Sequence, residues 1–163
     1  MKMVPVLKTD RLFLRGISEE DTGFIVKLRS NPEVFKFFVS SHKITAEEHI
    51  KWFKESYLSN VNRIDWIASD SGGELVGVFG IKREDKKSKE AEVSYILSPE
   101  QYGKGYASEA INRLKVFCRD EWKCSYVVAE IHELNIDSIR FAEKLGFEQV
   151  EKRGIFLLYK RKV

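Results

Sequence analysis

Two glycines flank a lysine in the run Gly103-Lys104-Gly105, and this run is the feature of the sequence best suited to hold a ligand. Glycine lets the main chain approach an oxyanion closely, because no Cβ stands in the way. A helix that begins directly after such a loop leaves the N–H groups of its first turn without intrahelical partners, and it carries the positive end of its dipole there. With the charge of Lys104 added, the run predicts a site for a phosphate group.

Two common nucleotide-binding motifs do not fit this loop. The P-loop motif requires Ser or Thr after its lysine, and Lys104 is followed by Gly105. The dinucleotide-binding motif requires a third glycine where Ser108 stands. The structural alternative is a glycine-bearing turn that binds no ligand. The place of this loop between a strand and a helix favours the anion site.

The sequence predicts a strand before the glycine loop and a helix after it. A strand over residues 91–98 is predicted to stop at Pro99, which cannot donate a hydrogen bond to a neighbouring strand. After the loop, apolar residues recur at spacings of three and four, which predicts the longest helix of the second half of the chain. These residues are Ala107, Ala110, Ile111, Leu114, Phe117 and Cys118.

Cap signals, alternating apolar residues and glycine turns predict the remaining elements. Ser18 and Thr45 start helices that occupy much of residues 19–59, and Gly146 ends a helix that starts at Asn135. Further strands are expected over residues 11–15, 64–68, 75–81, 126–131, 147–152 and 155–160.

This order of elements predicts a mixed α/β fold in a single domain over residues 1–163. The sheet is expected to hold about six to seven strands flanked by about four helices, with a parallel crossover in the middle and antiparallel pairs elsewhere. One antiparallel pair is the hairpin around Gly72-Gly73.

Composition excludes several classes of protein. Of 163 residues, 43% are hydrophobic, and no uncharged apolar run approaches the length of a membrane span, so we expect a soluble domain. The N-terminal segment is too charged for a secretory signal, which predicts a cytoplasmic location. A net charge of +3 gives no reason to expect a nucleic-acid or membrane partner. Cys118 and Cys124 match neither a disulfide framework nor a zinc pattern, so no metal is expected.

Three segments of the sequence resemble the GCN5-related N-acetyltransferases (GNAT), and within them the branch of ribosomal-protein N-terminal acetyltransferases such as RimJ and RimL. The first segment is Thr9-Asp-Arg-Leu-Phe-Leu-Arg15, and the second, YILSPEQYGKGYASEA, runs from Tyr95 to Ala110. In the third, Asn135-x-x-Ser138 leads to Lys144-Leu-Gly-Phe147. The resemblance implies a GNAT-like acyl-CoA N-acyltransferase fold and acetyl-CoA as the acetyl donor.

In that family the glycine loop takes the pyrophosphate of acetyl-CoA, the preceding strand pairs with the pantetheine arm, and the helix after the Asn flanks the thioester. The resemblance therefore implies a set of donor-binding residues by position. They are Ile96, Leu97, Tyr102, Gly103, Lys104, Gly105, Tyr106, Ala107, Asn135, Ser138 and Phe141.

Two positions depart from the family pattern. Tyr102 stands where the broad pattern has Gln or Arg, although an aromatic residue is usual there in the RimJ-like branch. Ala142 stands where many members carry a tyrosine that protonates the leaving thiolate. A different acid is therefore needed. Ser138 is placed like a serine of the RimL branch and is our candidate for that acid.

Acetyl transfer also needs a base, because an amine attacks only in its neutral form. Glu92 lies on the strand beside the expected donor groove and is our candidate base, the alternative being a solvated residue on the strand face. His132 is a second candidate. Asn135 also suits the N-cap of its helix, and a main-chain N–H of residues 93–98 would hold the oxyanion.

The amine acceptor is expected against residues 32–58, a region that lies over the acceptor groove in this family. Phe38, His49 and Trp52 are the candidate substrate residues, the alternative being a role in the helix core. The resemblance suggests a protein or peptide α-amine. A nucleotide-linked amino sugar or another small amine is the alternative acceptor, and a non-catalytic acyl-CoA sensor is an alternative of another class. The chain is expected to act as a monomer or homodimer.

Overall fold

Eight strands form one sheet in the part of the chain that this computed structural model describes, residues 2–38 and 42–163. The predicted mixed α/β fold is confirmed, with one strand more than expected because the two-residue edge strand β1 gives no sequence signal. The strands are β1 (Leu7–Lys8), β2 (Leu12–Gly16), β3 (Arg63–Asp70), β4 (Leu75–Lys82), β5 (Glu90–Leu97), β6 (Tyr126–His132), β7 (Glu148–Arg153) and β8 (Phe156–Lys162). Their spatial order is β1-β2-β3-β4-β5-β6-β8-β7.

Five α-helices accompany the sheet in these described residues, one more than expected. The additional helix is the one-turn α2, in which Pro32 is the first residue and the Asn31 side chain accepts a hydrogen bond from the N–H of Glu33 at 3.0 Å. The helices are α1 (Thr22–Arg29), α2 (Pro32–Phe35), α3 (Ala46–Trp52), α4 (Tyr106–Asp120) and α5 (Ile136–Lys144).

Helix α3 begins where the sequence predicts it. Thr45 Oγ1 accepts a hydrogen bond from the N–H of Glu48 at 3.1 Å, which satisfies one of the free amides of the first turn. The chain then continues from α3 into a π-helical turn, Phe53–Tyr57. Turns of this kind are often found at functional sites.

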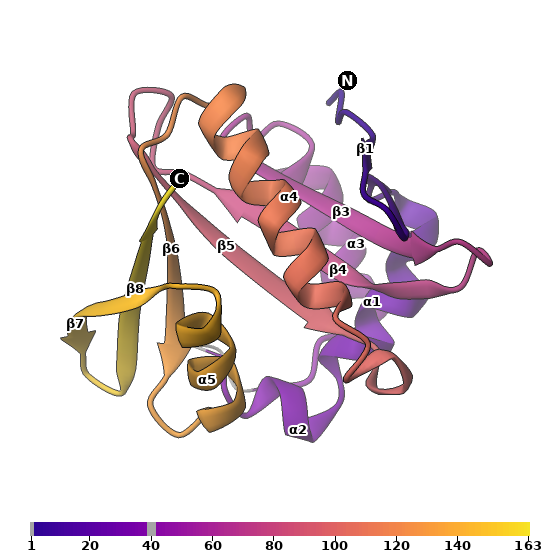
Figure 1. The fold of residues 1–163 in the computed structure, drawn as a ribbon. Helices are drawn as coiled ribbons and strands as arrows, with labels where there is room; N and C mark the ends of the chain where they lie inside the picture. The colour runs from indigo at the N-terminus through magenta and orange to yellow at the C-terminus, as the bar shows by residue number, and fades with distance from the viewer. Residues whose placement is uncertain (1, 39–41) are drawn as a thin grey trace.

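The helices lie on both faces of the sheet (Figure 1). Helix α4 runs across one face, and α1 and α3 lie on the other. Two neighbouring residues of β3 show that each face has its own core: the ring of Trp66 lies 5.4 Å from that of Phe117 in α4, whereas Ile67 packs with Ile25 of α1. Alternation along a strand therefore decides which face a side chain serves.

The sheet opens between β5 and β6, which form the parallel pair among the described strands. Their pairing joins residues 90–92 to residues 126–128 and goes no further. On its other edge β5 stays paired with β4 as far as Leu97. Beyond Glu92, β5 therefore turns unpaired backbone N–H and C=O groups toward β6, and Figure 1 shows the two strands diverging toward α5.

Candidate functional site

A cavity of about 1320 Å³ occupies the opening between β5 and β6. It exceeds the roughly 300–1,000 Å³ of an ordinary small-molecule pocket, so it has room for two reactants. We call the part lined by β5, residues 102–103 and 105–108, and α5 the donor half, after the ligand that the sequence leads us to expect there. The part lined by α1, α2, α3 and the strand faces beneath them is called the acceptor half for the same reason. Every predicted site residue except Lys104 lines this one cavity.

The glycine loop leaves backbone amides free at the start of α4. Gly103 and Gly105 adopt left-handed conformations, with φ of +76° and +80°, which glycine reaches without steric cost. Gly105 is the N-cap of α4, no side chain caps this end, and the N–H of Glu109 bonds to the C=O of Gly105 at 3.1 Å. The amides of residues 106–108 lie at the positive end of the helix dipole, which suits the phosphate site that the sequence predicts.

Arg11 holds this loop against the start of β2. Its Nη1 donates to the C=O of Lys104 at 2.8 Å, and its Nε pairs with the carboxylate of Glu109, also at 2.8 Å. The same guanidinium lies 4.6 Å from the centre of the Tyr106 ring. These contacts hold the loop in one conformation, which lowers the entropic cost of binding a ligand. The sequence gives no sign of this contact beyond the place of Arg11 in a family-like segment.

The side chain of Lys104 serves the loop itself. Its Nζ donates to Oε1 of the buried Gln101 at 3.0 Å, and Lys104 is not among the residues that line the cavity. The positive charge therefore stays near the loop, while the main chain of the neighbouring residues faces the cavity.

Two hydroxyl groups meet where α5 borders the donor half. Asn135 Oδ1 caps α5 by accepting the N–H of Ser138 at 3.3 Å, in keeping with the N-cap expectation. Ser138 also interacts with Tyr95 of β5: burial raises the pKa of the Tyr95 phenol to about 12, and a hydrogen bond with Ser138 acts in the opposite direction. The ring of Phe141 packs edge-on against Tyr95 with centroids 5.2 Å apart. Sequence reasoning missed Tyr95, because alternation shows only that it belongs to a strand.

Both candidate bases lie on the diverging strands. Glu92 pairs with Val128 at the last position where β5 and β6 are joined, and its partly buried carboxylate lies 3.2 Å from Lys82 Nζ. His132 lies at the far end of β6, where its Nδ1 accepts the N–H of Leu134 at 3.0 Å. Glu92 is thus the carboxylate at the point of divergence.

His49 is a buried neutral imidazole with a free acceptor atom. It is 1% exposed, and its Nδ1 lies 3.1 Å from Thr22 Oγ1, which donates its own proton to the C=O of Glu19. Nδ1 must therefore carry the ring proton, and Nε2 offers a lone pair. Nε2 has no hydrogen-bond partner in the described residues, a deficit that costs about 1–3 kcal/mol. Burial, followed by the charge of Arg29, lowers the pKa of His49.

The other two predicted acceptor residues each contact an arginine. The centre of the Trp52 ring lies 4.9 Å from the guanidinium of Arg63 and 5.5 Å from the His49 ring. The ring of Phe38 lies 5.5 Å from the guanidinium of Arg29. Trp52 also packs against the smaller apolar core, so its lining and core roles coexist.

Arg63 and Asp65 form an ion pair at the start of β3. Arg63 Nε lies 2.7 Å from one carboxylate oxygen of Asp65, and Nη2 lies 3.3 Å from the other. Gly80 provides the space, because a Cβ there would lie 2.3 Å from Asp65 Oδ1. The hydroxyl of Tyr57, in the π-helical turn, accepts the N–H of Asp65 at 2.9 Å. The charge of Asp65 is therefore neutralised by Arg63, and Tyr57 holds the main chain of Asp65 in place.

Arg29 differs from Arg63 because no carboxylate pairs with it in the described residues. It is the last residue of α1, partly buried, and it lines the acceptor half. Burial, followed by the charge of Arg63, lowers the pKa of Arg29, and the charge of Asp65 acts more weakly in the opposite direction. The acceptor half thus holds a cation in a place that disfavours an isolated charge.

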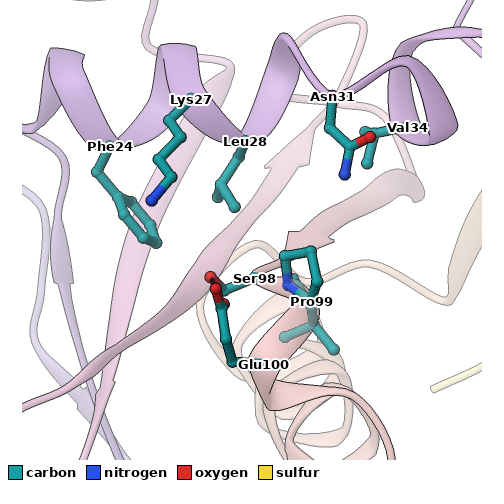
Figure 2. Close-up of a pocket in the computed structure, with 9 residues that line it drawn as sticks. Phe24, Lys27, Leu28, Asn31, Val34, Ser98, Pro99 and Glu100 are labelled. Carbon is teal, nitrogen blue, oxygen red and sulfur yellow. Dashed lines mark hydrogen bonds between the residues drawn. The ribbon is translucent and has the colours of Figure 1, made fainter.

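A smaller pocket of about 240 Å³ lies where α1 faces the turn before the glycine loop (Figure 2). Phe24 and Lys27 of α1 point across it toward Ser98 and Glu100. Its volume is below the roughly 300 Å³ of an ordinary ligand site. We therefore interpret it as the packing boundary between α1 and the loop region.

Other chemically capable groups give no second site in the described residues. Burial raises the pKa of the Cys118 thiol to about 12, so this cysteine is protonated and unreactive. No group of three or more His, Cys, Asp or Glu side chains is placed to hold a metal ion among those residues. Within the same residues, no helix combines the length and apolar character needed to cross a bilayer.

Comparison with known proteins gives concordant matches. A family model described as acetyltransferase (GNAT) domain matches residues 11–148. An uncharacterized N-acetyltransferase of Bacillus subtilis, YoaA, is 29% identical over 96% of this chain and 89% of its own length. FsC-acetyl coenzyme A-N(2)-transacetylase of Aspergillus fumigatus is 27% identical over 93% of this chain and 68% of its own. The crystal structure of spermidine N-acetyltransferase from Vibrio cholerae, in complex with CoA and spermine, has the same fold, with a TM-score of 0.83, 17% identity and coverage of 95% and 96%.

Proposed function

This chain belongs to the GNAT acetyltransferase family, and we propose that the amine it acetylates is the α-amine of a protein or peptide. The family model and the acetyltransferase relatives make the chain an acetyl-CoA-dependent acetyltransferase. The non-catalytic sensor therefore has no support. The proposal concerns the acceptor and the residues that act on it.

The donor half suits acetyl-CoA through its main chain. The free amides at the start of α4 match the negative pyrophosphate, and the unpaired edge of β5 over residues 93–97 can exchange hydrogen bonds with the amides of the pantetheine arm. The observation that carries this assignment is that both features line one continuous cavity. CoA in the crystal structure of the Vibrio cholerae relative supports it.

The reaction joins the acceptor nitrogen to the acetyl carbon and breaks the carbon–sulfur bond. Glu92, at the point where the strands diverge, takes a proton from the nitrogen directly or through water. A main-chain N–H of residues 93–98 stabilises the oxyanion. Ser138 gives a proton to the departing sulfur, and the adjacent phenol of Tyr95 replaces that proton. Tyr95 then regains a proton from solvent and Glu92 releases its own to solvent, so both groups return to their starting states and the protons balance.

The charges of the acceptor half favour an α-amine over a polyamine such as the spermidine of the Vibrio cholerae enzyme's name. A polyamine needs free carboxylates, whereas three of the five carboxylates that line this cavity are already paired with cations. The other two, Glu130 of β6 and Asp137 of α5, belong to exposed residues outside the helices of the acceptor half. An α-amine, with a pKa of about 8, also asks less of a base than an alkyl ammonium with a pKa of about 10. The three pairs are Glu33–Lys36, Asp65–Arg63 and Glu92–Lys82.

A nucleotide-linked amino sugar or another small amine is the second candidate acceptor. The aromatic rings of Phe38 and Trp52 line the acceptor half, and a flat base could stack on either of them. A peptide would make only apolar contacts with these rings, which are less specific than the stacking of a base.

Several finer expectations belong to the same proposal. We propose that the chain is a single acetyltransferase domain over residues 1–163 of the RimJ/RimL-like branch. We also propose that it works in the cytoplasm as a monomer or homodimer.

Release of the CoA thiol from acetyl-CoA tests the acceptor assignment. The protein is given a short peptide with a free α-amine, the same peptide blocked at its N-terminus, spermidine and a nucleotide-linked amino sugar. We expect the free peptide to give the highest kcat/KM, by about tenfold or more, equivalent to about 1.4 kcal/mol of transition-state stabilisation. Faster turnover of spermidine or the sugar than of any free peptide would contradict the proposal.

A further inference from the structure

Arg29 is the cation of the acceptor half that pairs with no carboxylate among the described residues. The other cations that line this half, Lys36, Arg63 and Lys82, each pair with a carboxylate. A guanidinium presents its donors in a planar fork, which matches a carboxylate through two parallel hydrogen bonds. The fork of Arg29 therefore has the chemistry of an anion site and lies at the cavity wall.

The helix dipole does not account for the place of Arg29. A cation in the last turn of a helix is favourable, and Lys27 occupies the same turn with an exposed side chain. Arg29 instead lies partly buried, and both burial and the nearby Arg63 lower its pKa. An anion bound beside Arg29 would offset both effects.

His49 supplies a second, independent observation. Its Nε2 is a buried lone-pair acceptor without a partner in the described residues, and His49 lines the same cavity as Arg29. A lone-pair acceptor suits the N–H of an amine, whereas the donors of Arg29 suit a carboxylate. The donors of Arg29 therefore match an anion on the acceptor, and the neutral His49 adds no competing positive charge beside it.

We propose that the acceptor carries a carboxylate close to its reacting amine and that Arg29 binds this carboxylate. The inference rests on the proposed function and names the substrate class of the same site. Two sources share this chemistry: a free amino acid, and a peptide whose first residue is Asp or Glu. A polyamine lacks the anion and does not fit.

Matched acid and amide acceptors test the assignment. The pairs are alanine with alaninamide, and a peptide that begins with Glu with the same peptide beginning with Gln. In wild-type protein we expect kcat/KM for the acid of one pair to exceed that for its amide by about 10- to 100-fold. Arg29→Gln should bring that ratio close to one. The pair that shows the preference identifies the source of the carboxylate.

Arg119→Gln is the matched control, because Arg119 also lies in the last turn of a helix, α4, but is exposed and pairs with Asp120 at 2.7 Å. It should leave the acid-to-amide ratio unchanged. Arg29→Lys keeps the charge and loses the planar fork, so it should retain part of the preference.

Binding is measured in parallel, because it does not require turnover. The melting temperature of the CoA-bound protein is recorded with each acid and each amide, in wild type and in Arg29→Gln. If no pair is acetylated but the acids raise the melting temperature through Arg29, the proposed function fails and the carboxylate assignment stands. If acid and amide act alike in both measurements, or a preference survives Arg29→Gln, the assignment is overturned.

Discussion

The two halves of the cavity offer different kinds of chemical group to their ligands. The donor half presents main-chain amides of the glycine loop and of the β5 edge, and a side chain such as Arg11 serves to hold that main chain in place. The acceptor half presents side chains, chiefly Arg29, His49 and Trp52. Main-chain amides do not depend on residue type, so they suit a ligand that is always the same, as the acetyl donor is. Side chains can be substituted to fit a different amine without a change of fold. We therefore expect the identity of the acceptor to depend on α1 and α3 rather than on the glycine loop.

The largest effect is expected where the two halves meet. Glu92→Gln should lower kcat by about 100- to 1,000-fold, the usual contribution of a general base, without a change in acetyl-CoA affinity. The loss should be greatest at low pH, because at high pH more of the acceptor is already neutral. The measurement is thiol release across a pH series, with acetyl-CoA affinity from calorimetry.

Lys82→Met separates catalysis by Glu92 from its ion pair. This variant removes the partner 3.2 Å from Glu92 and keeps the carboxylate. We expect it to retain most of the activity. An equal loss in both variants would mean that the ion pair, rather than proton transfer, is what Glu92 contributes.

The next effect isolates the main chain of the donor half. Gly105→Val places a β-branched residue at φ +80°, with its Cβ 3.2 Å from Arg11 Nη2. We expect acetyl-CoA to bind about 30- to 100-fold more weakly, because the loop must change conformation and lose amides that face the phosphate. Calorimetry with acetyl-CoA provides the measurement.

Gly154→Val is the matched control for backbone strain. Gly154 has φ +62°, lies in the hairpin between β7 and β8, and would meet no atom within 4 Å of its Cβ. It should lower stability by a similar amount and leave the affinity for acetyl-CoA unchanged. If both glycine variants bound acetyl-CoA normally, the loop would have no part in donor binding.

The smallest effect is the contribution of His49, in the acceptor half, to the pH dependence of the free energy of unfolding. The pKa of His49 is lower in the folded chain than in the unfolded one, so the unfolded state binds more protons as pH falls below about 6.5. The free energy of unfolding should therefore decrease between pH 7.5 and 5, and the decrease should be smaller in His49→Gln. Urea denaturation at both pH values tests this. Identical pH dependence in the two proteins would show that His49 does not titrate as described.

Local rules were enough to predict most of the helices and strands around the donor half. The spacing around Gly103 and Gly105, the cap at Asn135 and the stop at Gly146 depend on residues close together in the chain, and the structure has a helix end at each of them. The two-residue strand β1 is too short for a periodic pattern, so the sequence did not predict it.

The acceptor half depends on contacts between distant segments. Nothing near Arg29 in the sequence shows that it lacks a carboxylate, because Asp65, which pairs with Arg63, lies in another element. In the same way, the interaction of Tyr95 with Ser138 joins β5 to α5. The sequence also cannot show that β5 and β6 separate after Glu92, because the length of a strand pair is set by packing on both faces.

Amide hydrogen exchange with and without CoA tests the central claim, that the donor is held by main-chain groups along the opening of the sheet. We expect CoA to slow exchange at residues 93–97 and 103–108, and to leave the hairpin around Gly154 unchanged. If CoA bound, as shown by calorimetry, and these two segments exchanged at the same rate as before, the claim would be wrong.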